Sequence, residues 1–373
     1  MTYDVVIIGA GPAGSHLCNL LTKHDLNVAL VDRLSFPRDK LCGGLLTQKT
    51  LDLLNTFYPS KVFSGYGIKS AHIFYMDELI FSLNLLSMAC TVRRNIFDTD
   101  LVKISKKQGA STYFGKALIS IDFLKNEVHL QDGSVLKYVQ LVGADGAFSR
   151  VRYLSGVPRN QLGFCAETHI PWNQIKYPRR LNEGGIEIYY GNYSKGYGWI
   201  FPNYSSVIVG VGNMVNEMRE KEIVSLFKEF LHNVSHSSDI KFSGAYIPSG
   251  TSVALGNPVY KNVCLIGDAA GLIDPFTGEG IYYALISAEI AAKAILTGKL
   301  SLPQYMSNMQ SILDTIKDNT DMRNQIYTPT ILKNSLATMQ SMPKYSEQMI
   351  DETIVRYSKT YREAYEEFQY YSR

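Results

Sequence analysis

The first fifty residues alternate between short apolar runs and a periodic apolar segment. Residues 5–8 and 28–31 are the apolar runs, and Leu17, Leu20 and Leu21 repeat between them at the spacing of one helix face. A short apolar run is typical of a buried strand, and a repeat every three to four residues is typical of an amphipathic helix. The pattern therefore predicts a strand, a helix and a second strand at the start of the chain.

Strands and one helix are expected in the segment that follows. Residues 68–84 alternate apolar and polar positions on both sides of residues 76–78, which predicts two strands on a different sheet. A helix is expected at about 98–107, a hairpin around 132–133 and a buried strand at 139–142. These later elements are expected to belong to the first domain, together with the first fifty residues.

Short β-like runs dominate the region between about residues 160 and 250. Runs at 185–190 and 207–211 predict strands, and one amphipathic helix is expected near 220–232. A strand at 263–266 then leads through a glycine-rich turn into a long helix from about 278 to 296. The rest of the chain is expected to be helical.

The order of these elements predicts an α/β protein with a Rossmann-like domain interleaved with a β-rich substrate domain and followed by a helical C-terminal tail. Because no low-complexity linker is present, the chain is expected to cross between the two domains several times. The predicted cofactor-binding domain comprises residues 1–65, 90–158 and 250–300, the substrate domain comprises 66–89 and 159–249, and the tail comprises 301–373.

Composition narrows the function classes. Hydrophobic residues make up 46% of the chain, which excludes intrinsic disorder, and a net charge of +3 without a basic stretch argues against nucleic acid as a partner. No window reaches the roughly 18 apolar residues of a membrane-spanning helix, so we expect a cytoplasmic protein. The five cysteines are dispersed and never spaced as CxxC, which argues against disulfides and against a bound metal.

A glycine-rich turn carries the first chemical signal. Gly9, Gly11 and Gly14 follow the first strand at GxGxxG spacing, and Asp32 ends the second strand. In this arrangement the glycines allow a tight turn and the approach of a pyrophosphate to a helix N-terminus, while the acid accepts hydrogen bonds from ribose hydroxyls. The sequence therefore predicts a bound dinucleotide, although this turn alone does not distinguish NAD from FAD.

Two further glycine–acid pairs favour FAD. Gly143 to Gly146 and Gly267 to Asp268 each end an apolar run, and residues 274–281 read DPFTGEGI. With the N-terminal turn, and in this order, these segments resemble the FAD-binding domain shared by flavin hydroxylases of the p-hydroxybenzoate hydroxylase type, flavin-dependent halogenases and geranylgeranyl reductases. The resemblance implies that Asp268 holds the ribityl hydroxyls, and that the helix after Gly280 directs its positive end toward the flavin.

Two more segments resemble the geranylgeranyl reductase branch. Residues 36–45 (FPRDKLCGGL) are similar to a loop that this branch places over the flavin, and residues 196–202 (GYGWIFP) are similar to its YxWxFP segment, which lines the substrate cavity. The resemblance implies Cys42 and Tyr197 as catalytic residues and Tyr197, Trp199, Phe201 and Pro202 as substrate-binding residues. The implied FAD-binding residues are Gly9, Gly11, Pro12, Ala13, Gly14, Asp32, Arg33, Cys42, Gly43, Gly44, Arg94, Asp145, Gly146, Gly267, Asp268, Pro275, Gly278, Gly280 and Ile281.

The resemblance implies an FAD-dependent oxidoreductase that reduces C=C bonds of an isoprenoid or a similarly apolar substrate. NAD(P)H or a redox protein is the expected electron donor. A monooxygenase or halogenase acting on an aromatic or polyketide compound is one alternative, and an electron-transfer or lipid-binding flavoprotein without turnover is another. In the tail, apolar residues from Ile354 to Phe368 recur at helical spacing, which indicates packing or, alternatively, a lid that collects a prenyl lipid at a membrane surface.

Overall fold

The computed structural model describes residues 2–59, 63–237, 239–257, 259–298 and 302–371. Contacts divide the chain into two units. Unit 1 comprises residues 1–40, 94–161 and 248–317, and unit 2 comprises residues 41–93, 162–247 and 318–373. The chain thus passes between the units repeatedly, while the domain boundaries given above stay a prediction.

Unit 1 is built on a seven-stranded sheet with the strand order β6-β2-β1-β9-β8-β7, in which β15 also pairs with β9. β1 pairs in parallel with β2 and β9, and β9 pairs in parallel with β15. Parallel strands are covered on both faces, which explains why their sequences are continuous apolar runs. The strands are β1 (Thr2–Ile8), β2 (Val28–Asp32), β6 (Ser111–Phe114), β7 (Leu118–Asp122), β8 (Glu127–Leu130), β9 (Val135–Gly143) and β15 (Val263–Leu265).

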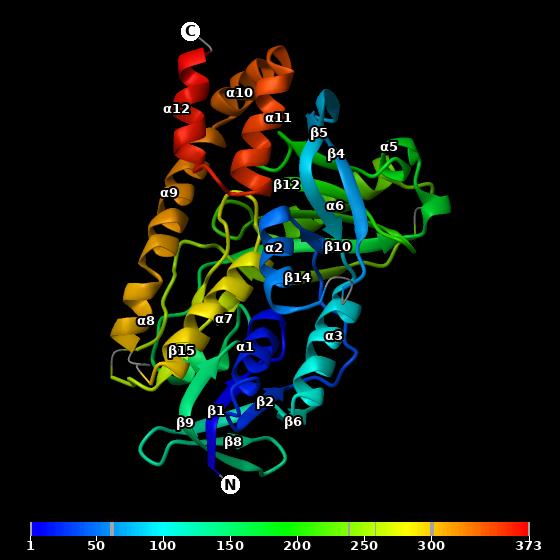
Figure 1. Ribbon diagram of the computed structural model, residues 1–373. Coiled ribbons are helices and arrows are strands. Elements are labelled where there is room, and N and C mark those ends of the chain that lie inside the picture. Colours follow the sequence, from blue (N-terminus) through cyan, green and yellow to red (C-terminus); the bar gives the residue numbers. More distant parts are fainter. Residues whose placement is uncertain (1, 60–62, 238, 258, 299–301, 372–373) are drawn as a thin grey trace. The chain divides into compact units, whose positions relative to one another are not determined.

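The helices of unit 1 pack mainly around α1 (Pro12–Thr22). This helix lies against α7 (Ile281–Leu296) and α3 (Arg94–Lys107), as Figure 1 shows. Asn19 of α1 joins the last pair, because its amide donates to the Leu101 carbonyl at 3.2 Å and its Oδ1 accepts from Ser105 Oγ at 2.6 Å. The unit also contains α4 (Arg150–Leu154), a 3-10 turn (Gly267–Ala270) and α8 (Leu302–Asn308).

Unit 2 is built on an eight-stranded sheet with the strand order β14-β10-β13-β12-β11-β4-β5-β3. One face packs on α6 (Glu220–Val234), and the other face carries Trp199 and Phe201 in a second apolar cluster. The strands are β3 (Leu45–Leu46), β4 (Tyr66–Tyr75), β5 (Glu78–Thr91), β10 (Leu162–Ile170), β11 (Gly185–Tyr190), β12 (Tyr197–Pro202), β13 (Val207–Met214) and β14 (Ser243–Pro248).

The helices after α8 are α9 (Gln310–Ile326), α10 (Pro329–Ser341), α11 (Pro343–Ile350) and α12 (Tyr361–Tyr371). Two further helices of unit 2, α2 (Gln48–Phe57) and α5 (Arg179–Asn182), come earlier in the chain. Leu332 and Leu336 of α10 are buried in the same cluster as Trp199 and Phe201. Helix α10 therefore packs on the apolar face of the unit 2 sheet.

The α/β class, the interleaved order and the helical C-terminal part are confirmed. The continuous helical stripe expected from Ile354 to Phe368 is wrong. A π-helical turn spans Asp351–Val355, and Tyr357 then adopts a positive φ of 59°, so α12 is a separate helix. The side chain of Phe368 lies outside the described residues. Among the described residues, no helix is long and apolar enough to span a membrane.

Candidate functional site

The glycine-rich turn between β1 and α1 is held by close backbone packing. A Cβ on Gly14 would lie 1.9 Å from the Gly9 carbonyl oxygen, and one on Gly9 would lie 2.2 Å from the Ala144 oxygen. Gly11 differs, because a Cβ there would meet only Arg38 Nη2, at 3.6 Å. The turn is therefore compact on the protein side and open at Gly11, where Pro12 begins α1 and the helix N-terminus offers amides to an anion.

Asp32 supports this turn from the end of β2. Its Oδ2 accepts a hydrogen bond from the Ala10 amide at 2.8 Å, and its Oδ1 accepts from the Leu34 amide at 2.9 Å. A carboxylate has about four acceptor positions, so two remain for ribose hydroxyls. Arg33, the next residue, is exposed.

Two arginines share one buried acid beside the turn. Asp98 of α3 is fully buried, and its carboxylate binds Arg94 through bonds of 2.7 and 2.9 Å and lies 3.2 Å from Arg38 Nη2. Two cations against one anion leave a net positive charge, and Arg38 brings that charge to Gly11. Sequence analysis identified Arg94 but missed Arg38 and Asp98, although Arg38 stands in the FPRDK segment.

Asp145 has a structural role in this unit. Its carboxylate accepts from Ser149 Oγ at 2.5 Å and from the amides of Arg150 and Val151 at 2.6 and 3.2 Å, which caps the start of α4. Burial raises the pKa of Asp145, and these hydrogen bonds oppose the shift. Gly146 follows with a positive φ of 83°.

Asp268 lies where the other segments of unit 1 meet. Gly267 packs against Ala13, since a Cβ on the glycine would lie 3.1 Å from the Ala13 Cβ. Asn160 donates to the carbonyls of Ala147 and Asp268, both at 3.0 Å. These contacts bring the three glycine-containing motifs together.

The environment of the Asp268 carboxylate fits a polyhydroxyl ligand. Burial raises its pKa, while the positive charges of Lys40 and Arg94 act in the opposite direction. Its Oδ1 lies 3.4 Å from the position of a Cβ on Gly280, the residue that caps α7. Within the described residues no group donates a hydrogen bond to this carboxylate, so its acceptor capacity is available to hydroxyl groups.

The loop before α7 is preorganised by Asp274. The carboxylate of this buried residue accepts from the amides of Phe276 and Thr277 at 2.7 and 3.0 Å. Gly278 has a positive φ of 74°, and Ile281 is the first residue of α7. Pro275 is buried in the same loop. The N-terminus of this sixteen-residue helix, with its partial positive charge, is thereby held in place.

In unit 2, the turn at Cys42 packs on the aromatic strand β12. A Cβ on Gly43 would lie 2.9 Å from the Phe201 ring and 3.4 Å from Trp199 Nε1. Cys42 is half-buried, and the Gly44 amide donates to its Sγ at 3.3 Å. The contacts thus bring Cys42, Gly43 and Gly44 together with two of the four residues implied for substrate binding.

The other two residues are the ends of β12. Tyr197 is half-buried, with its ring centroid 5.7 Å from that of Trp199, and the Pro202 carbonyl accepts a hydrogen bond from Thr91 Oγ1. Trp199 is 7% exposed, and its Nε1 has no acceptor among the described residues. The aromatic face therefore contains one unused hydrogen-bond donor beside Gly43.

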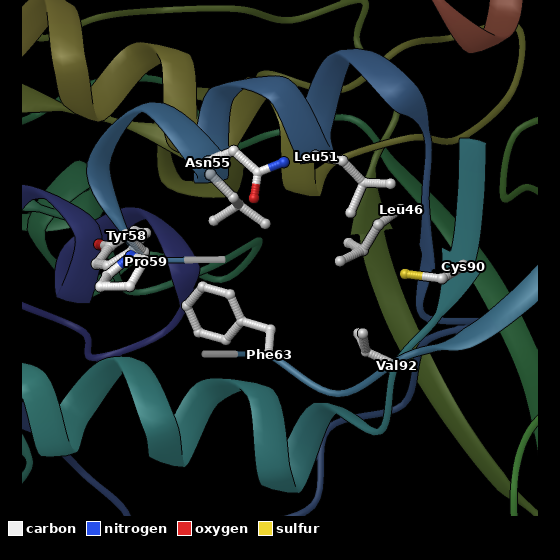
Figure 2. A pocket seen from close by; sticks show the side chains of 9 residues that line it. Leu46, Leu51, Asn55, Tyr58, Pro59, Phe63, Cys90 and Val92 are labelled. Carbon is white, nitrogen blue, oxygen red and sulfur yellow. The ribbon is translucent and has the colours of Figure 1, made fainter. Parts of the chain in front are cut away.

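A separate cavity of about 50 Å³ is lined by residues of α2, β3 and β5 and of the segments next to them (Figure 2). Leu46, Leu51, Phe63, Cys90 and Val92 are among the residues that line it, and burial raises the pKa of Cys90 to about 11. Ligand pockets usually measure about 300–1,000 Å³. This cavity is too small for a prenyl chain, and we do not assign it to the substrate.

The fold and the turn at Gly9 to Gly14 define a dinucleotide-binding protein. Residues 2–296 match the family model described as FAD binding domain. The chain belongs to this FAD-binding family and, within it, to the geranylgeranyl reductase-like oxidoreductases. It is an enzyme with FAD as its cofactor.

Two curated relatives and one solved structure illustrate the relationship. The chain is 30% identical over 310 residues to geranylgeranyl diphosphate reductase of Rhodobacter capsulatus, covering 79% of this chain and 75% of that protein. It is 27% identical to digeranylgeranylglycerophospholipid reductase of Methanococcus vannielii, covering 82% and 81%. A geranylgeranyl bacteriochlorophyll reductase-like structure from Thermoplasma acidophilum superposes with a TM-score of 0.76 at 20% identity, covering 99% and 98%. This structural likeness concerns the fold.

Proposed function

We propose that this protein reduces C=C bonds of an isoprenoid or a similarly apolar substrate. The observation that supports this most directly is the Cys42 turn, which packs on Trp199 and Phe201 within an apolar sheet face. A long hydrocarbon chain is stabilised by such a surface through the hydrophobic effect. The names of the relatives point to geranylgeranyl chains as substrates of those proteins.

The proposed FAD site lies in unit 1. Gly11 and the N-terminus of α1, with Arg38 and Arg94, would receive the pyrophosphate, and Asp32 would accept hydrogen bonds from the adenosine ribose. Asp268 would accept hydrogen bonds from the ribityl chain, and the N-terminus of α7 would favour negative charge on the flavin ring. When bound and reduced, FAD supplies a hydride.

The residues of unit 2 would exclude water and supply a proton. Addition of a hydride to an unpolarised double bond requires a proton at the other carbon, delivered where bulk water is absent. Cys42 and Tyr197 are the candidates, since Gly43, the residue after Cys42, packs against Trp199, and the Tyr197 ring centroid lies 5.7 Å from that of Trp199. The buried indole and the Phe201 ring provide the dry surroundings.

The electron donor and the location of the substrate form part of the same proposal. NAD(P)H or a redox protein would reduce the flavin, and the protein would act in the cytoplasm on a prenyl lipid, including one presented at a membrane surface. The described residues contain no group of three His, Cys, Asp or Glu side chains arranged to hold a metal ion.

Anaerobic reduction of the purified protein tests the function. The reduced protein is mixed with geranylgeraniol, geranylgeranyl diphosphate or a geranylgeranyl phospholipid while the flavin absorbance is followed. We expect reoxidation without oxygen and a product that has gained two hydrogens per double bond. Reoxidation by oxygen alone, with a hydroxylated or halogenated product, would identify a monooxygenase or halogenase instead. Reversible reduction with ligand binding and no product would identify a carrier flavoprotein.

A further inference from the structure

A buried carboxylate lies on the apolar face of the unit 2 sheet. Glu167 of β10 is 2% exposed and is paired in register with Gly210 of β13, which is in turn paired with Trp199 of β12. Cross-strand partners project from the same face of a sheet. Glu167 therefore lies on the face of Trp199, where burial of a carboxylate is costly unless it is hydrogen-bonded.

Gly210 of β13 lies between Glu167 and Trp199 in the register of the sheet. A Cβ on Gly210 would lie 2.2 Å from Trp199 Cζ2, so the indole extends over the glycine that separates it from Glu167. No residue with a side chain can occupy position 210 without displacing the indole. The glycine at position 210 thus leaves the space that the indole occupies.

Glu167 contacts the turn that contains the proposed proton donor. Its Oε1 accepts a hydrogen bond from the Cys42 amide at 2.9 Å. Farther along the turn, the Gly44 carbonyl accepts from the Val92 amide at 2.8 Å, and Gly44 has a positive φ of 67°. Glu167 and Val92 therefore hold the two ends of a short turn, and within it the Gly44 amide donates to the Cys42 sulfur at 3.3 Å.

We propose that Glu167 is a positioning residue for Cys42. Its carboxylate fixes the Cys42 amide and thereby the direction of the thiol beside Trp199. The inference rests on the proposed function only in taking Cys42 as a group that faces the substrate. What matters in this role is the acceptor oxygen, because the hydrogen bond comes from a neutral backbone amide.

If Glu167 only stabilised the fold, Cys42 would be alkylated at the wild-type rate in any folded variant that lacks the carboxylate. A methionine fills a volume similar to that of glutamate and carries no charge whose burial is costly. Glu167→Met would then fold and bind FAD while leaving the Cys42 amide without its acceptor. Glu167→Gln keeps an acceptor oxygen at the same place.

The experiment measures alkylation of Cys42 by iodoacetamide in the FAD-loaded protein, by peptide mass spectrometry, together with turnover. In Glu167→Met, we expect iodoacetamide to alkylate Cys42 about fivefold faster or more, because the released turn opens more often. We also expect kcat of this variant to fall about tenfold or more. Glu167→Gln should stay within about twofold of the wild-type protein in both measurements, since the acceptor is retained.

Glu187→Gln is the matched control. Glu187 is also buried, at 3% exposed, but its partners are Arg180 Nε at 2.8 Å and the Tyr189 hydroxyl at 2.6 Å. It is paired in register with Ile200, which belongs to the cluster on the α6 face. Loss of this carboxylate should leave Cys42 alkylation unchanged, whereas a change equal to that in Glu167→Met would overturn the proposal.

Hydrogen exchange at the Cys42 amide keeps the test decisive if Glu167→Met does not fold. We expect this amide to be protected in the wild-type protein and in Glu167→Gln, and exchange at the rate of an open amide in the wild-type protein would overturn the proposal. Wild-type alkylation in folded Glu167→Met would also overturn it. Faster alkylation with unchanged turnover would support the positioning contact and contradict the proposed role of Cys42.

Discussion

The space around each α-carbon differs within the glycine-rich turn, so Gly14 and Gly11 should respond differently to substitution by alanine. Gly14→Ala places a Cβ 1.9 Å from the Gly9 oxygen, so the backbone must shift, at a cost of about 1–3 kcal/mol or more. Gly11→Ala meets only the end of Arg38, and its φ of −74° suits alanine. We expect Gly14→Ala to lower the melting temperature and to lose FAD.

Gly11→Ala should fold normally but bind FAD about tenfold or more weakly, because its methyl group occupies the face that the pyrophosphate approaches. Thermal denaturation and fluorescence titration with FAD measure the two effects. Equal melting temperatures for the two variants would contradict this assignment of roles.

Asp268 links FAD binding to pH. Burial holds its pKa above the ordinary value of 3.8, so the folded apoprotein binds this proton more tightly than the unfolded chain does. Stability from this group is therefore complete at low pH and is lost as the pH rises through the folded-state pKa. Asp268→Asn removes the loss, and the apoprotein should melt a few degrees higher at pH 7, with no gain near pH 3.

The same variant should bind FAD about tenfold or more weakly, because the amide oxygen is a poorer acceptor for hydroxyl groups. Melting curves of the apoprotein at several pH values, with FAD titrations at pH 7, measure both effects. A variant that is less stable than the wild-type protein at pH 7 would show that Asp268 is held by hydrogen bonds rather than strained by burial.

Local motifs account for the site residues that sequence analysis identified, and the absence of a motif accounts for those it missed. Gly9 to Gly14 and Asp32 have fixed spacings that follow from one strand, turn and helix. Asp98 and Glu167 act through residues far away in the chain, at Arg38 and Cys42. Such contacts depend on sheet register and helix packing, which no local spacing records.

Element boundaries follow from packing as much as from periodicity. The helix expected at 98–107 begins at Arg94, because Arg94 pairs with Asp98 four residues later and extends the first turn. The helix expected from about 278 begins at Ile281, since Asp274 holds the preceding residues in a turn. In the tail, the helix breaks at Tyr357, where no glycine or proline in the sequence predicts a break.

Helix α10 offers a prediction at the scale of one element. Leu336 is 6% exposed and belongs to the cluster of Trp199 and Phe201. Leu336→Ala should cost about 2–5 kcal/mol of unfolding free energy and leave space beside the aromatic strand. Under the proposed function, turnover of a longer prenyl chain should rise relative to a shorter one.

Lys333→Ala, on the exposed side of α10, is the control and should change the unfolding free energy by no more than about 0.5 kcal/mol. Urea denaturation and product analysis with two chain lengths provide the measurements. Unchanged chain-length preference in a destabilised Leu336→Ala protein would limit α10 to a structural role.

For the whole molecule, the important feature is that the proposed FAD site draws on three separated stretches of one unit. Gly267 packs on Ala13, and Arg152 donates to the carbonyls of Ala269 at 3.2 Å and Ser252 at 2.8 Å. Arg152 is 3% exposed, and burial lowers its pKa to about 10. These contacts mean that a ligand held by one stretch stabilises the others.

Hydrogen exchange should show this coupling. Free FAD at about 100 times its Kd adds about 2.7 kcal/mol to the stability of the unit that binds it, which slows exchange about 100-fold for amides that open with that unit. We expect the slowing in residues 2–40, 94–161 and 248–298 together. Gly14→Ala, which should not retain FAD, is the control and should show no slowing. Protection by FAD confined to residues 41–93 and 162–237 would contradict the assignment of the cofactor to unit 1.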